Sequence, residues 1–103
     1  MKTTLINDLY LGFMRIHILH HASQERIYGA WLLEELGRHG YSVGPGTLYP
    51  MLHRMESNNL LKSEYETVAG KRRRYYRSTR VGEDMLDKAR KHMMELVKEI
   101  NEE

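Results

Sequence analysis

Hydrophobic residues recur at helical spacing in several stretches of the chain, and the first stretch spans residues 3–21. Its main apolar positions are Ile6, Leu9, Phe13 and Ile16. Their 3-4-3 spacing predicts an amphipathic helix. Four more apolar side chains widen this face: Leu5, Tyr10, Met14 and Ile18. A helix with so broad an apolar face usually needs two neighbours to cover it. In a chain this short, one of those neighbours could be a second subunit.

After a polar break at residues 22–26, a second helix is predicted over residues 27–39. Its apolar stripe consists of Tyr28, Leu32 and Leu36, with Trp31 beside it. Gly37 and Gly40 mark its end, as glycines commonly do. Residues 41–43 are expected to form an extended link and are a candidate for one small strand.

A third, shorter helix follows, and the sequence supports two starting points for it. Pro45 suits a first helical position, whereas Pro50 fits better as the third position after a Thr47 cap. Its buried stripe is predicted to be Leu48, Met51, Leu52 and Met55. The opposite face carries Gly46, Pro50, His53 and Ser57, flanked by Thr47 and Arg54 on one side and Tyr49 on the other. Asn58 and Asn59 are expected to end the helix, because Asn tolerates the left-handed conformation.

Residues 60–66 and 73–77 alternate in character and are predicted to pair as a hairpin through a turn at 67–72. Four consecutive basic residues, from Lys71 to Arg74, lie on or beside that turn. A short helix followed by a hairpin with a basic tip is the layout of a winged helix. The predicted fold class is therefore mainly α with a small β-hairpin wing.

A last helix is predicted after Ser78 or Thr79, either of which can cap it, with acidic residues in its first turn. Leu86, Ala89, Met93, Leu96 and Ile100 recur along it at 3-4-3-4 spacing. This narrow seam is typical of helices that pair with one another.

The composition of this 103-residue chain is that of a small globular protein, and its net charge of +2 becomes informative when it is divided along the chain. Residues 45–80 carry eight Lys/Arg and three Asp/Glu, whereas residues 81–103 carry four and seven. Positive charge is thus concentrated in the helix–hairpin block, which points to nucleic acid. The chain has no cysteine and no apolar run long enough to span a membrane, and we expect a cytoplasmic protein.

The candidate DNA contacts lie on the outer face of the third helix and on the basic hairpin. A helix that enters the major groove needs a slim polar face, and phosphate oxygens need cationic donors. The predicted DNA-binding residues are Thr47, Tyr49, His53, Arg54, Lys71, Arg72, Arg73 and Arg74. Two alternatives remain: the cations can protect a sheet edge, and Tyr49 can pack against the hairpin.

Two further groups of side chains could support other chemistry. His17, His20 and His21 form an H-x-x-H-H run in which His17 and His21 could share a metal ion, but no cysteine or neighbouring carboxylate completes a site, and we assign no metal and no cofactor. Trp31, Met14 and Met93 are candidate effector contacts near a dimer groove. No nucleophile–base pair, phosphate-binding glycine loop or carboxylate pair is evident, so we expect no enzyme activity.

The chain resembles the PadR family of transcriptional regulators in several segments. These are residues 44–56 (GPGTLYPMLHRME), 60–63 (LLKS) and 70–77 (GKRRRYYR), followed by Thr79 and Gly82. The similarity is close from Tyr41 to about Leu96. The chain departs from the family at Tyr28-Gly29-Ala30, where members often carry His-Gly-Tyr, and it is similar to the short-form members.

The resemblance implies a homodimeric winged helix-turn-helix regulator. Residues 1–80 would form the DNA-binding domain, with the first helix also in the dimer interface, and residues 81–103 the dimerisation helix. The interface is expected to contain Leu9, Phe13, Ile16, Leu86, Ala89, Met93, Leu96 and Ile100. The resemblance further implies a repressor of a neighbouring gene and of its own gene, bound to a palindromic operator and released by a small aromatic or hydrophobic effector. The alternatives are a protein-interaction module with an acidic partner and a metal-responsive regulator.

Overall fold

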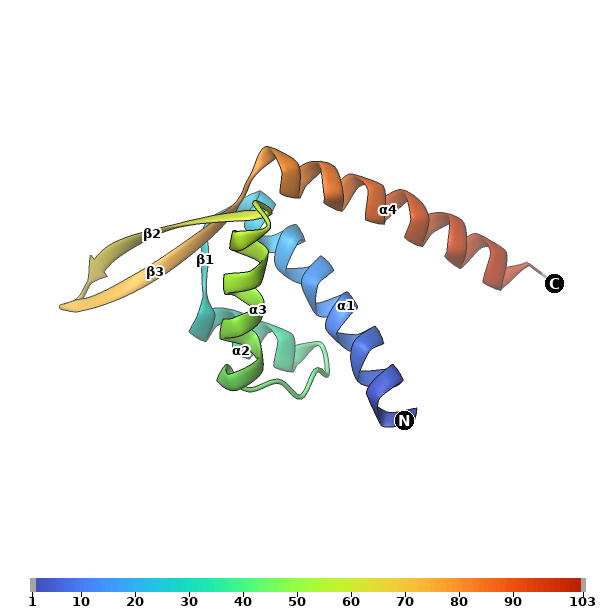
Figure 1. The fold of residues 1–103 in the computed structure, drawn as a ribbon, viewed down its shortest axis with the longest axis horizontal. Helices are drawn as coiled ribbons and strands as arrows, with labels where there is room; N and C mark the ends of the chain where they lie inside the picture. Colours follow the sequence, from blue (N-terminus) through green and yellow to red (C-terminus); the bar gives the residue numbers. More distant parts are fainter. Residues whose placement is uncertain (1, 103) are drawn as a thin grey trace.

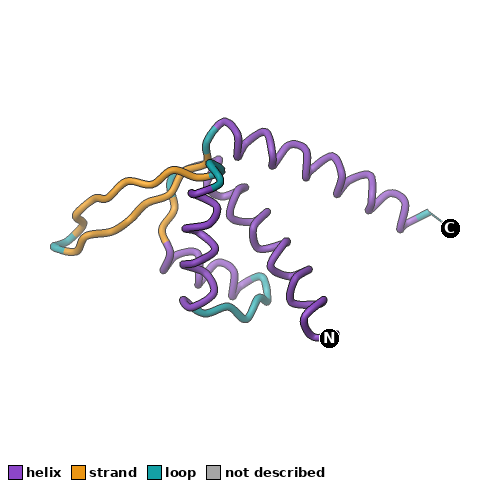
Figure 2. The backbone as a smooth tube through the Cα atoms, viewed as in Figure 1, coloured by secondary structure: helices purple, strands orange, loops and turns teal. Residues whose placement is uncertain are grey.

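Four α-helices and a three-stranded sheet make up the computed structural model, which describes residues 2–102 (Figures 1 and 2). The elements, in chain order, are α1 (Lys2–Gln24), β1 (Ile27–Tyr28), α2 (Gly29–Arg38), α3 (Pro45–Ser57), β2 (Leu61–Val68), β3 (Lys71–Ser78) and α4 (Arg80–Asn101). The sheet is antiparallel with the strand order β1-β3-β2. The predicted fold class, mainly helical with a β-hairpin wing, is confirmed.

The hydrophobic core lies where α1, α2, α3 and the base of the hairpin meet. Its fully buried members include Ile18, Leu32, Leu36, Leu48, Leu52 and Leu61. On α1 the buried residues are Met14, Ile18, Leu19 and Ala22. The predicted stripe of α1, which runs through Leu9 and Phe13, instead remains largely on the surface.

The boundaries between α1 and α3 differ from the predicted ones. The helix continues through the predicted break as far as Gln24, because Ala22 is buried in the core. Ile27 and Tyr28 do not begin α2 but form the strand β1, which pairs with Tyr76 and Tyr75 of β3. Residues 41–43 form no strand. The small third strand therefore exists, but it precedes α2.

Helix α3 begins at Pro45, so the first of the two predicted starts is confirmed and the Thr47 cap is wrong. Gly44 is the N-cap, and its carbonyl oxygen accepts hydrogen bonds from the backbone N–H groups of Thr47 and Leu48. Pro50 lies inside the helix. As predicted, the helix ends at the asparagines, and Asn59 is left-handed with φ 63°.

The wing turn is tighter than predicted. Strand β2 continues to Val68 and β3 starts at Lys71, which leaves only Ala69 and Gly70 between them. Both have positive φ, 51° and 80°, as a two-residue turn with the twist of a hairpin requires. The four basic residues, Lys71 to Arg74, consequently lie along β3 and alternate between the two faces of the sheet, rather than clustering on a loop.

A small hydrogen-bonded junction fixes the start of α4. Thr79 is the N-cap: its side-chain oxygen accepts from the Gly82 N–H at 2.9 Å and donates to the Asn59 carbonyl at 2.6 Å. The Thr79 N–H donates to the Leu60 carbonyl at 3.1 Å. Ser78, the other predicted cap, is buried at the end of β3.

The molecule is far from spherical. Figure 1 shows α4 running away from the body on the side opposite the wing, and α1 and α4 diverging from a common junction. The Cα radius of gyration is 14.9 Å, whereas a compact 103-residue domain has about 12.8 Å. The chain exposes 7494 Å², against about 6,100 Å² expected for a compact monomer of 12.2 kDa. Within residues 2–102 no helix is both long enough and apolar enough to cross a membrane.

Candidate nucleic-acid interface

Helix α3 presents the outer face that its sequence predicts. Leu48, Met51, Leu52 and Met55 are buried in the core. Thr47, Tyr49, His53 and Arg54 are all exposed. The polar side chains therefore project from a helix that is held in place by its apolar stripe, as a helix that enters a groove must be.

Tyr49 is positioned by a glycine on the neighbouring helix. A Cβ atom on Gly29, the first residue of α2, would overlap the Tyr49 ring. The ring therefore lies directly against the backbone of α2, while 39% of the residue stays exposed. The close approach of the Tyr49 ring thus explains why position 29, in the Tyr28-Gly29-Ala30 segment, is a glycine. The sequence alone did not indicate this contact.

The wing face that looks toward α3 is organised around Arg74. Its guanidinium pairs with Glu56 of α3 at 2.6 Å and donates to the Ser63 hydroxyl at 3.0 Å. The same carboxylate accepts hydrogen bonds from the Ser63 N–H and hydroxyl at 3.1 and 2.7 Å. A nitrogen of His53 lies 3.4 Å from Arg74. Arg74 is half-buried and joins the wing to α3.

The opposite wing face carries a stack of arginine and tyrosine side chains. Arg73 lies 4.0 Å above the Tyr28 ring and donates to the Tyr75 hydroxyl at 3.3 Å. Arg26 lies 4.0 Å above the Tyr75 ring and pairs with Glu66 and Glu64. Sequence reasoning missed Arg26, because nothing in the chain order indicates that it reaches the wing. Tyr75 and Tyr76 are both buried.

The predicted cations therefore fall into two groups. Arg73 and Arg74 are half-buried and engaged by neighbouring side chains. Arg54, Lys71 and Arg72 are exposed, and no carboxylate of the described residues pairs with them. Arg72 stacks 3.9 Å above the exposed Tyr65 ring, which holds its charge near the wing tip.

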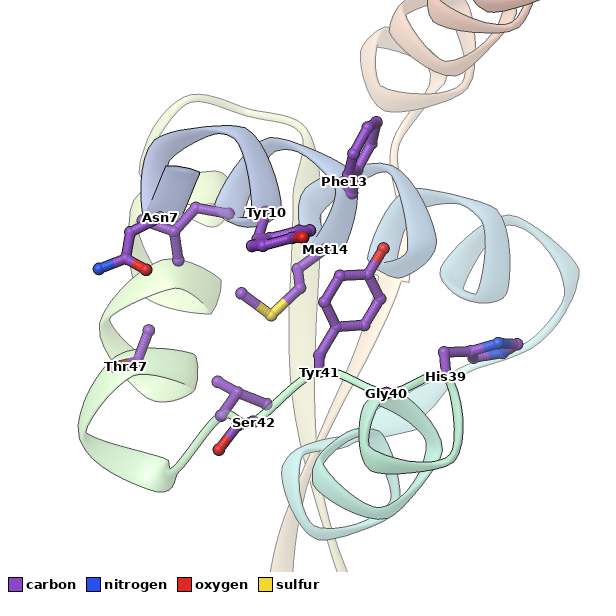
Figure 3. A pocket seen from close by; sticks show the side chains of 11 residues that line it. Asn7, Tyr10, Phe13, Met14, His39, Gly40, Tyr41, Ser42 and Thr47 are labelled. Atoms are coloured by element: carbon purple, nitrogen blue, oxygen red, sulfur yellow. The ribbon is translucent and has the colours of Figure 1, made fainter. Parts of the chain in front are cut away.

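Two cavities border α1, and the three candidate effector residues do not share either of them. The larger, of about 720 Å³, lies between α1, the 39–43 link and α3, and Figure 3 shows Met14 and Tyr41 projecting into it. The smaller, of about 330 Å³, lies between α1 and α4 and includes Met93. Phe13 and Tyr41 line both. Trp31 lines neither and packs at the edge of the core.

The predicted dimer residues form an apolar surface on α1 and α4. Leu9 and Phe13 are exposed on α1, and Leu96 and Ile100 on α4, where Ile100 is 69% accessible. Ile16, Ala89 and Met93 are half-buried. Leu86 is buried within its own chain and anchors the base of α4. These helices also expose apolar side chains outside the predicted dimer set, among them Leu5, Ile6, Met85 and Val97.

Comparison with known proteins gives consistent matches. A model of the transcriptional regulator PadR-like family matches residues 18–88. The curated Transcriptional regulator Rv3488 of Mycobacterium tuberculosis (strain ATCC 25618 / H37Rv) is 52% identical over 87 residues, which cover 84% of this chain and 81% of that protein. These matches are to transcriptional regulators and not to enzymes, as expected for this chain.

Two solved structures show the same fold over nearly the whole chain. A PadR family transcriptional regulator from Eggerthella lenta DSM 2243 is 31% identical with a TM-score of 0.80, covering 95% of this chain and 87% of that one. A PadR-like transcription factor from Bacteroides fragilis is 28% identical with a TM-score of 0.81, covering 95% and 96%.

Proposed function

The chain belongs to the PadR-like family of transcriptional regulators, and from that premise we propose that it is a homodimeric repressor that binds a palindromic operator in the cytoplasm. The observation that carries this proposal is the exposed polar face of α3 beside a wing whose outermost cations pair with no carboxylate of residues 2–102. Helix α3 would enter the major groove, and the wing would follow the flanking backbone.

We narrow the predicted set of DNA contacts according to what each side chain already engages within the protein. Arg54 and His53 would read or contact the groove from α3, with Thr47 and Tyr49 beside them. Lys71 and Arg72 would contact phosphates from the wing tip, because their charges are exposed. We assign Arg73 and Arg74 to holding the wing, since each already engages protein side chains. Phosphate contacts would supply affinity, and α3 would supply sequence choice.

Dimerisation is supported by the unpartnered apolar surface of α1 and α4. Leu96, Ile100 and Val97 lie on the part of α4 that runs away from the body, where their own chain does not cover them. A second copy that contributes the same surface would bury them and bring two copies of α3 to one side of the molecule. Such self-complementary contact is the usual arrangement of a twofold dimer.

Release by a small aromatic or hydrophobic effector would use the cavities beside α1. Phe13 and Tyr41 offer aromatic walls to both cavities, and Met14 and Met93 offer one flexible side chain to each. The smaller cavity lies between α1 and α4, so an occupant there would contact the helices proposed to form the dimer. Membership of the same family is also the basis for proposing repression of a neighbouring gene and of the protein's own gene.

The test is selection of genomic DNA fragments by the purified protein at about 150 mM salt, where non-specific binding is weak. We expect one palindromic site, including one upstream of the protein's own gene. On that site, Lys71→Ala with Arg72→Ala should weaken binding. The slope of log affinity against log salt concentration should become less steep by up to about 1.8 per protomer, since each lost phosphate contact removes about 0.9 from it.

The matched control is Lys88→Ala with Lys91→Ala, which removes the same charge from exposed positions on α4. This variant should bind the selected site with an affinity within about twofold of that of the wild type. Arg54→Ala should reduce the free energy of binding to the operator by about 1–3 kcal/mol, and that to unrelated DNA by much less. Binding that is blind to sequence in the folded, dimeric wild type would overturn the operator proposal and favour an acidic protein partner for the wing.

A further inference from the structure

Three histidines converge between α1 and the end of α2, and a carboxylate lies beside two of them. His17 and His21 lie one turn apart on α1, and Glu35 and His39 lie one turn apart at the end of α2. The ligand nitrogens of the three histidines all lie within 4.8 Å of one another. A Glu35 oxygen lies 3.1 Å from His39 Nε2 and 3.5 Å from His21 Nε2. Sequence reasoning saw only the α1 pair, because the partners follow 14 or more residues later.

The pKa shifts of three of these side chains, His17, His21 and Glu35, are in the direction that favours metal binding. Burial, reinforced by the neighbouring His39 and His21, lowers the pKa of His17. Burial also lowers the pKa of His21, against the opposing charge of Glu35. Burial of Glu35 opposes its ionisation, but hydrogen bonds from Arg38 and His39 outweigh this and lower its pKa. Neutral imidazoles and an ionised carboxylate are the forms that coordinate a cation.

Aromatic packing alone does not account for this arrangement. His17 stacks on His39 with 4.7 Å between ring centroids, and His21 meets Trp31 edge-on at 5.1 Å. Packing would be satisfied whichever way the ring nitrogens pointed, yet here the three nitrogens converge and a carboxylate oxygen lies beside those of His21 and His39. Arg38 pairs with the other oxygen of Glu35, which leaves Oε2 to the histidines.

We propose that His17, His21, His39 and Glu35 form a binding site for one divalent transition-metal ion of the zinc class. Three imidazoles and one carboxylate are a four-coordinate set for such an ion, whereas Mg²⁺ and Ca²⁺ prefer oxygen ligands. Ligand atoms around tetrahedral zinc lie about 3.4 Å apart, so the histidines close inward by small rotations. His39, exposed at the helix end, has the freedom to do so.

Occupancy would connect two functional parts of the molecule and goes beyond the proposed repressor activity. His17 borders the cavity between α1 and α4. His39 caps α2 and begins the link that leads into α3. The ion would therefore fix the dimer-facing helix against the segment that positions the reading helix.

The test uses tag-free, full-length protein stripped of metal, without DNA, so that it does not depend on the operator. Calorimetric titration with Zn²⁺ should give one ion per chain, and Mg²⁺ should give none. Co²⁺ should produce the visible absorption of a tetrahedral site. Co²⁺ should also quench the fluorescence of Trp31, the single tryptophan, through its contact with His21.

Variants identify the ligands. His39→Ala and Glu35→Gln should each weaken Zn²⁺ binding at least ~10-fold, with unchanged circular dichroism in the absence of metal. His20→Ala is the matched control, because His20 belongs to the same run but not to the converging set, and it should bind within about twofold of wild type. Absence of Zn²⁺ binding to the wild type, or equal loss in His20→Ala, would overturn the proposal.

Discussion

The junction between the wing and α4 depends on the absence of a side chain at Gly82. A Cβ there would collide with the Leu60 carbonyl oxygen, and it would also lie 3.3 Å from Leu19 Cδ2. The carbonyl cannot move freely, because it accepts the hydrogen bond from the Thr79 N–H. One glycine thus lets the first turn of α4 lie directly on the α3–β2 connection.

We therefore expect Gly82→Ala to lower the free energy of unfolding by about 1–3 kcal/mol, as overpacking against a fixed neighbour does. Urea denaturation at one fixed protein concentration measures it, since stability of a dimer depends on concentration. Gly37→Ala is the control: this helical glycine has open space around its Cβ position. That change should be neutral or stabilise by up to about 1 kcal/mol. Equal stability of the two variants would refute the steric explanation.

At the same scale, sequence reasoning identified the exposed side chains of α3 but not the partners of the wing arginines. Helical periodicity alone separates Leu48 from His53, so that distinction could be predicted. That Arg74 pairs with Glu56 and Arg73 covers Tyr28 depends on tertiary contacts between residues 18 and 45 positions apart. No local pattern encodes such contacts. The same limit hid the approach of Glu35 and His39 to the histidines of α1.

At the scale of elements, the long helices and the hairpin were predictable, and the short pieces were not. Strand β1 has two residues, too few to show alternation, and its Ile27 and Tyr28 fit the apolar pattern of the helix that follows. The wing turn was predicted too long because Ala69, in a left-handed conformation, is not a turn-forming residue type. The end of α1 was misplaced because polar residues surround the buried Ala22.

The exposed seam of α4 gives a prediction at this scale. Leu96→Glu with Ile100→Glu should convert the proposed dimer to monomers, because the two changes place four like charges at the twofold contact. Sedimentation equilibrium measures the dissociation constant, which we expect to rise at least ~100-fold, corresponding to about 2.7 kcal/mol.

Met94→Glu provides the comparison for that experiment. Met94 is exposed on the same helix, but at 100° per residue it lies to the side of the seam. The Met94→Glu variant should have a dissociation constant within a few-fold of that of the wild type. Equal dissociation of both variants would mean that the dimer uses another face of α4.

For the whole molecule, the proposed dimer fixes the distance between two copies of α3. Adjacent major grooves on one side of DNA are about 34 Å apart, the length of one helical turn. Insertion of about 5 base pairs at the centre of the selected operator would turn one half-site to the opposite side of the duplex. We expect affinity to fall at least ~100-fold, as measured by fluorescence anisotropy. Retained affinity would show that each protomer binds its half-site independently.

The divergence of α4 from the body has a mechanical consequence. Its 22 residues make an arm about 33 Å long that is attached to the body through the Thr79 junction and Leu86. If this arm is clamped to its twin, a pivot at the junction turns the whole DNA-reading body. Helix α3 extends 13 residues, or about 20 Å, from that junction, so a pivot of about 10° displaces its far end by about 3.4 Å, the rise of one base pair. A shift of that size takes α3 out of register with its groove. The cavity lined by Leu86, Arg90 and Met93 lies at the pivot, so a small occupant there would change the angle between α4 and the body.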